Sequence, residues 1–193
     1  MTAGSTPAAS SSIVTAAESL THRLLDENRG RLHHCAGVAA RARALTPTVA
    51  PDEGEILVAA AWLHDIGYST RVRESGFHPL DGARYLRRHH WPALVCDLVA
   101  HHSGSRFVAV ILDLTGALAE FTHREDALSD ALTVADKTTG PDGAEIDLDA
   151  RMRGMLSRHD PASPTARAHG EREPYFRAAF DRVEHRLKNA PRP

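Results

Sequence analysis

The sequence has little of what marks secreted or membrane proteins. Only two of its 193 residues are cysteine, Cys35 and Cys96, and their spacing fits neither a disulfide framework nor a metal-binding pair. The sequence also has no run of about 18 apolar residues, which is the length needed to cross a membrane as a helix. The first twelve residues lack the basic and apolar regions of a secretory signal. We therefore expect a reduced, cytoplasmic protein with no membrane partner.

The sequence also has no excess of basic over acidic residues. The formal net charge is −2 and the isoelectric point is about 6.7, so polymeric nucleic acid is not an expected partner. Hydrophobic residues make up 42% of the chain and charged residues 25%, which are ordinary values for a soluble domain. A chain of this length buries enough surface to fold without disulfides.

The alternating pattern of β-strands is absent, and the apolar spacing predicts an all-α bundle of about six to eight helices. Residues 1–13 are expected to form a disordered tail, residues 14–160 the main domain, and residues 161–193 a C-terminal helix that packs on it. The first helix is expected to open at a capping box formed by Thr15 and Glu18 and to stop at Gly30. Further helices are expected at about 31–45, 51–67, 78–88, 91–102, 124–140, 147–157 and 165–188, with a short helix or irregular chain over 105–117.

Histidine is the compositional outlier, with 13 residues. Several histidines and one aspartate lie at helical spacing from apolar residues: His34 with Val38, His64 with Leu57 and Ala61, His101 with Leu94 and Leu98, and Asp136 with Leu128 and Leu132. A single histidine on an apolar face is usually a core residue with a hydrogen-bond partner. That explanation weakens when five elements each offer a His or Asp, because a bound cation is what offsets the burial of such a set.

The order of these residues resembles the HD-domain superfamily of metal-dependent phosphohydrolases. The resemblance is carried by His34, by His64 and Asp65 in "HDIG", by the pair His101-His102, and by Asp136 in "VADK". It covers about residues 31–140 and implies the helical bundle of that superfamily. It also implies a first metal ion held by His34, His64, Asp65 and Asp136.

Members with a second metal ion carry further histidines, which the segments "FHPLDGARYL" and "VAHHSG" match. The resemblance thus implies His78 and His101 as ligands of a second ion, Asp65 as the bridge between the ions, and His102 as a further ligand or a substrate contact. The implied cofactor is two divalent ions, with iron or manganese favoured over zinc, nickel, cobalt or magnesium. Catalytic roles would fall to Asp65, Asp136 and His102, with Asp136 a candidate general base.

The expected function is hydrolysis of a phosphoester or phosphoanhydride bond in a small phosphorylated substrate, with a nucleotide favoured. The segment is similar to HD hydrolases that cleave dinucleoside polyphosphates. The Gly-Tyr-Pro signature of the cyclic-di-nucleotide phosphodiesterases is absent, and Tyr68 stands where mononuclear deoxynucleotidases have Glu. Basic residues near the ligands, Arg71, Arg73, Arg106 and Lys137, are candidates for neutralising phosphate charge, although basic loop residues usually face water.

Two other functions remain open at this point. Some HD proteins with a mixed-valent di-iron centre oxidise small polar substrates through the same ligand pattern, and others are non-catalytic regulatory modules. The C-terminal segment has apolar residues at helical spacing: Tyr175, Phe176, Ala179, Phe180, Val183 and Leu187. We expect this stripe to pack on the chain's own core, with a homodimer contact as the alternative.

Overall fold

The structure, a computed structural model, describes residues 12–158 and 160–190, with the course of the helix alone for residues 155–158. Within these ranges the fold is all-α, as predicted, and its one β-type contact is an isolated bridge between Thr139 and Glu145. The α-helices are α1 (Ile13–Leu24), α2 (Arg29–Leu45), α3 (Gly54–Leu63), α4 (His78–Arg88), α5 (Ala93–His101), α6 (Ser105–Ile111), α7 (Thr115–Leu118), α8 (Ala127–Lys137), α9 (Leu148–Arg158), α10 (Pro164–Arg167) and α11 (His169–Asn189). Three short 3₁₀ turns, η1 (Thr46–Thr48), η2 (Ile66–Tyr68) and η3 (His102–Gly104), join some of them.

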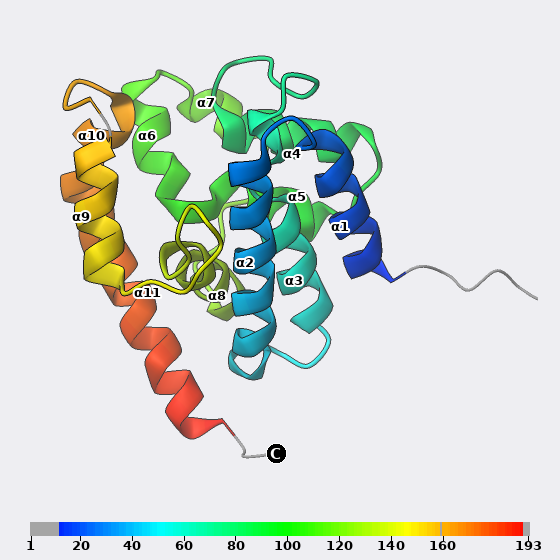
Figure 1. Cartoon of the computed structure of the whole chain (residues 1–193), viewed down its shortest axis with the longest axis vertical. Coiled ribbons are helices and arrows are strands. Elements are labelled where there is room, and N and C mark those ends of the chain that lie inside the picture. Colours follow the sequence, from blue (N-terminus) through cyan, green and yellow to red (C-terminus); the bar gives the residue numbers. More distant parts are fainter. Residues whose placement is uncertain (1–11, 159, 191–193) are drawn as a thin grey trace, which may run out of the picture.

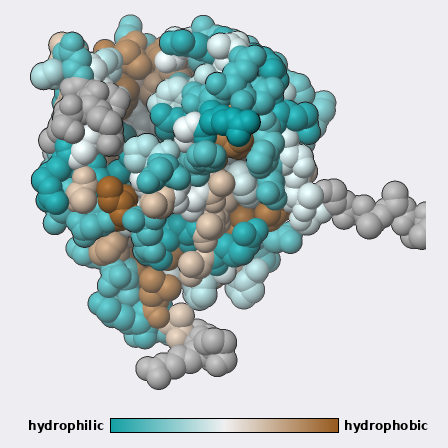
Figure 2. All heavy atoms as spheres, in the orientation of Figure 1, coloured by the Kyte–Doolittle hydropathy of each residue, from teal (hydrophilic) through white to brown (hydrophobic). Residues whose placement is uncertain are grey.

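Helix α3 lies at the centre of the bundle. All seven residues from Leu57 to Leu63 are buried, as expected for a helix that is apolar on every side. Helices α1, α2, α5 and α8 surround it, while α4 packs on α5 and α11 packs on α8 (Figure 1). Over the face drawn in Figure 2, hydrophilic residues predominate and the apolar residues that show form separate groups. Among the described residues, none of the helices is long and apolar enough to span a membrane.

The N-terminal helix boundaries differ from those expected. Helix α1 is capped by the side chain of Ser12, which accepts a hydrogen bond from the Thr15 amide, so the helix begins before Thr15. Gly30 does not end this helix; it lies in the first turn of α2, which Asn28 caps. Residues 1–11 of the predicted tail lie outside the described residues.

Later boundaries follow the predictions more closely. Helix α4 has the predicted bounds, and the segment 105–117 forms the two short helices α6 and α7. The segment expected to form one C-terminal helix is divided into α10 and α11. Phe176, Ala179 and Val183 of the apolar stripe are buried against the chain itself, chiefly where α11 meets α8 and α9.

A close backbone contact attaches the loop after α8 to α2. Gly143 has a positive φ of 84°, and a Cβ atom on Gly37 would lie 2.2 Å from the Gly143 carbonyl oxygen. Only glycine permits this approach at position 37, because any larger side chain would push the loop away from the helix. The loop matters for the site described below, since its Gly140 carbonyl contacts His34.

We predict that Gly37→Ala lowers the free energy of unfolding by about 1–3 kcal/mol, the usual cost of overpacking. The matched control on the same helix is Gly30→Ala, because nothing lies within 4 Å of a Cβ atom there. This control should be neutral or stabilising by up to about 1 kcal/mol. Urea denaturation of both variants measures the difference, and equal stability of the two would contradict the packing argument.

Candidate metal centre

A cavity of about 660 Å³ opens between α2, η2, α4, η3 and α8, with α9 and α11 at its far side. Its wall brings together five residues that the sequence analysis singled out: His34, Asp65, His78, His102 and Asp136. His64 lies beside them, fully buried. The fold brings together residues that are far apart in sequence: His34 and Asp136, which are in direct contact, are 102 positions apart.

The end of α3 places Asp65. The helix stops at Leu63, His64 and Asp65 form the turn that follows, and η2 begins at Ile66. Gly67 then allows this turn to touch α4, because a Cβ atom at position 67 would lie only 2.0 Å from the His78 carbonyl oxygen. The glycine of the HDIG sequence therefore brings the first residue of α4 to Asp65.

The loop before α4 is fixed by a buried aspartate. The Asp81 carboxylate accepts hydrogen bonds from the amides of Glu74, Ser75 and Gly76 at 2.9–3.1 Å. Asp81 is fully buried in the first turn of α4, and its bonds tie the preceding loop to this helix. These bonds fix the position of the loop that leads into His78.

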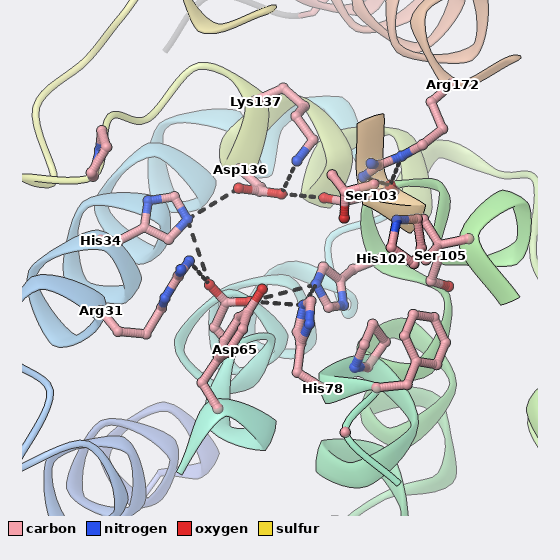
Figure 3. A pocket seen from close by; sticks show the side chains of 18 of the residues that line it. Arg31, His34, Asp65, His78, His102, Ser103, Ser105, Asp136, Lys137 and Arg172 are labelled. Atoms are coloured by element: carbon pink, nitrogen blue, oxygen red, sulfur yellow. Dashed lines mark hydrogen bonds and ion pairs between the residues drawn. The ribbon is translucent and has the colours of Figure 1, made fainter. Parts of the chain in front are cut away.

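Asp65 is the centre of the arrangement, because its two oxygens face different groups of histidines (Figure 3). Oδ2 lies 3.3 Å from Nε2 of His64 and 3.8 Å from Nε2 of His34. Oδ1 lies 3.3 Å from Nε2 of His78 and 3.7 Å from Nε2 of His102. The Arg31 guanidinium also donates to Oδ2 at 2.6 Å.

Asp136, in the last turn of α8, is the second carboxylate near His34 and His64. Its Oδ1 lies 3.1 Å from Nε2 of His34. Its Oδ2 accepts hydrogen bonds from the Ser103 hydroxyl and, at 2.7 Å, from the Lys137 ammonium group. Figure 3 shows these groups on the side of the cavity opposite Asp65.

Backbone carbonyls orient three of the four imidazoles. In each, Nδ1–H donates to a carbonyl oxygen, so Nε2 carries the lone pair and faces the carboxylates. The bonds join His34 to Gly140 at 2.9 Å, His64 to Ala61 at 2.7 Å and His102 to Val99 at 2.6 Å. This is the tautomer and orientation that a metal ligand needs.

The donor set fits divalent cations. Nε2 of His64 is buried and makes no hydrogen bond, although carboxylate oxygens lie close to it. The donor atoms of His34, His64 and Asp136 lie within 4.8 Å of one another, as do those of Asp65, His78 and His102. Ligands of one ion at bond lengths of about 2.1 Å lie roughly 3–3.5 Å apart. The two groups, which Asp65 connects, could therefore hold one ion each.

The charge states also suit metal binding. Burial alone would raise the pKa of Asp65, but His64 and Arg31 hold it well below its usual range, so the carboxylate is ionised. Burial would likewise raise the pKa of Asp136, which Lys137 and His34 keep low. Burial lowers the pKa of His78 to about 4 and also lowers that of His102, which leaves both imidazoles neutral as ligands must be.

The pKa of His64 shifts in the opposite direction to those of His78 and His102. Burial would lower its pKa, but the neighbouring Asp65 carboxylate outweighs burial and raises it. A proton and a metal ion thus compete for the same buried nitrogen of His64.

The structure corrects the assignment of His101. Its Nε2 bonds the Phe121 carbonyl at 2.9 Å and its ring packs on that of His123, away from Asp65. The reason is the end of α5: His101 is the last helical residue, and His102 begins the turn that enters the cavity. His102, expected as a further ligand or a substrate contact, occupies the place assigned to His101.

Three of the four predicted phosphate contacts also lie elsewhere. Arg71 is paired with Asp26 on the surface, Arg106 is paired with Glu125, and the exposed Arg73 does not line the cavity. Only Lys137 does line it. Proximity to a ligand in sequence therefore did not predict which basic side chains reach the cavity.

The sequence analysis missed Arg31, Ser103, Arg151 and Arg172, all of which line the cavity. Helical spacing could have found Arg31, since it lies three residues before His34 and so on the same face of α2. Ser103 follows His102 directly. Nothing in the sequence places Arg151 or Arg172, because the paths of α9 and α11 depend on tertiary packing.

The HD domain family matches residues 31–152, which is more than half of the chain. The chain therefore belongs to the HD domain family. Searches of curated proteins and of solved structures found no significant match.

We predict that His102→Ala lowers the number of divalent ions bound per chain, because it removes one of the two imidazoles that face Oδ1 of Asp65. The adjacent His101→Ala should leave the metal content unchanged, since that imidazole bonds a carbonyl outside the group. Elemental analysis of both purified variants decides the matter, with circular dichroism as the check on folding. The reverse result would restore His101 as the ligand.

Proposed function

We propose that the protein is a metal-dependent hydrolase with a dinuclear centre that cleaves a phosphoester or phosphoanhydride bond of a small phosphorylated compound. The observation that carries the proposal is the position of Asp65, whose two oxygens face separate groups of imidazoles. In this proposal His34, His64, Asp65 and Asp136 hold one ion, and Asp65, His78 and His102 hold the other.

Divalent ions at these positions would supply a nucleophile from water at neutral pH and Lewis-acid stabilisation of the phosphoryl group. The chain's own contribution is to fix the donors. Asp136 acts as a ligand rather than as a general base, because Ser103 and Lys137 already donate to its Oδ2 and keep its basicity low.

Basic side chains around the carboxylates favour an anionic substrate. Arg31 bonds Asp65 and Lys137 bonds Asp136, each a carboxylate that would bind a metal ion, and Arg151 approaches Oδ1 of Asp136 at 3.7 Å. Once the carboxylates are bound to cations, these basic groups are free to face the substrate. A phosphoryl group suits these basic groups, because guanidinium and ammonium groups form charge-assisted hydrogen bonds with phosphate oxygens.

The size of the cavity sets the range of substrates. About 660 Å³ is within the usual range of small-molecule sites, roughly 300–1,000 Å³. A nucleotide is the leading substrate in this proposal. The retained donor set speaks against a purely regulatory module.

The test is a screen of nucleotides and dinucleoside polyphosphates for phosphate or nucleotide release by protein loaded with Mn²⁺ or Fe²⁺. We predict that Asp65→Asn lowers the rate by more than about 100-fold, because it removes an ionised oxygen from both groups, whereas loss of an outer contact costs 10- to 100-fold. The matched control is Asp52→Asn, at an exposed turn before α3.

Three outcomes would contradict the proposal. The first is hydrolysis that Asp65→Asn leaves intact. The second is oxygen consumption by the iron-loaded protein without release from any phosphorylated compound, which would favour the di-iron oxygenase. The third is failure of both reactions with metal bound, which would favour the regulatory module.

A further inference from the structure

Arg172 enters the cavity from a part of the chain outside the matched HD domain. It lies in the first turns of α11, twenty residues beyond the end of the match at residue 152. Only 6% of the residue is exposed, and it lines the wall near Asp136 and Lys137. Figure 3 shows its guanidinium pointing toward Ser103 at the edge of the cavity.

The hydrogen bonds of this guanidinium are incomplete. Nε and Nη2 donate to the Ser103 carbonyl oxygen at 3.3 and 2.8 Å, and the Phe176 ring lies 5.2 Å from Cζ. Nη1 is buried and has no hydrogen-bond partner. Because a guanidinium stays charged at any physiological pH, a buried donor without an acceptor is costly.

Arg172 differs in this respect from the other basic residues of the cavity. Arg31, Lys137 and Arg151 each have a carboxylate oxygen within 4 Å, whereas no carboxylate of the described residues pairs with Arg172. Its neighbouring oxygen is a neutral carbonyl. Arg172 is therefore the basic residue of the cavity that has no ion-pair partner within 4 Å among the described residues.

Ser103 fixes Arg172 relative to the metal centre. Its backbone has a φ of 54°, in the left-handed region that residues other than glycine seldom adopt. In this conformation its hydroxyl donates to Oδ2 of Asp136 while its carbonyl accepts from Arg172. Strained residues of this kind are concentrated at functional sites. One residue thus holds both a metal ligand and the guanidinium.

We propose that the guanidinium of Arg172 binds an oxygen of a phosphate group of the substrate, beside the metal centre. This inference rests on the proposed function, which it extends by naming a binding residue from the C-terminal helix. The phosphate supplies the acceptor and the negative charge that Arg172 lacks. Nη2 remains on Ser103, so the contact uses one edge of the guanidinium and the position of the phosphate is set by the Ser103 backbone.

The test uses inorganic phosphate as the probe and the full-length, metal-loaded chain. We predict that Arg172→Met and Arg172→Gln weaken phosphate binding in calorimetry by about tenfold to a hundredfold, the usual value of a hydrogen bond to a charged group. Gln keeps an amide donor for the Ser103 carbonyl while it removes the charge. Metal content should be kept in both variants, and the unfolding temperature should be kept in Arg172→Gln, which retains a donor for the Ser103 carbonyl.

The matched control is Arg177→Met on the same helix, an exposed residue that pairs with Glu173 and Asp149. It should bind phosphate as the unsubstituted protein does. Phosphate affinity that is unchanged in folded Arg172→Gln would overturn the inference, as would a lack of phosphate binding by the unsubstituted protein. If Met unfolds the chain, the Gln variant decides between a binding role and a structural role.

The two proposals fail in distinguishable ways. Absence of hydrolysis in the substrate screen, with phosphate binding that depends on Arg172, removes the enzyme and keeps the anion site. Hydrolysis that persists with phosphate binding independent of Arg172 removes the anion site and keeps the enzyme.

Discussion

The structure depends on one buried carboxylate, that of Asp65, which has four imidazoles and a guanidinium around it. Such a group is costly to bury, and the apolar helix α3 carries it to the middle of the bundle. The helices on either side then have to bring compensating donors, which they do from α2, α4 and η3. Two oxygens of one carboxylate can serve two cations at once. Asp65 therefore accounts for the free-energy cost of burying a charge at this site and also for the proposed function.

Close contacts between backbones hold these donors in place. Gly67 lets η2 touch the His78 carbonyl, and Gly37 lets the Gly143 turn lie on α2. The second contact brings the Gly140 carbonyl to Nδ1 of His34, which sets the orientation of that ring. Neither glycine is needed for chain reversal at its own position. Each is needed because a side chain there would separate two elements that deliver ligands.

The fold class could be predicted from the sequence, because apolar spacing is a local property. Most of the residues that the structure brings together at the cavity were implied by the resemblance to the HD-domain superfamily, and spacing alone would not have grouped them. The exchange of His101 for His102 could not be predicted, since it depends on whether α5 ends one residue earlier or later, and helix ends are poorly specified by sequence. Arg71, Arg73 and Arg106 were placed by closeness in sequence, which does not give the direction of a side chain leaving a turn. Arg172 could not be predicted from the sequence as a residue of the cavity, because only the packing of α11 on α8 and η3 brings it there.

The charges of the cavity explain why the C-terminal helix belongs to the site. Four basic side chains and two carboxylates line the wall, so the protein places more positive than negative charge there before any cation is bound. Burial lowers the pKa of Lys137 to about 8 despite the adjacent Asp136, which reflects how poorly solvated this wall is. Divalent ions would make the excess larger, and no further carboxylate of the described residues lines the wall to balance it. A polyanionic ligand is the remaining source of negative charge, and Arg172 is the residue whose donor is left for it.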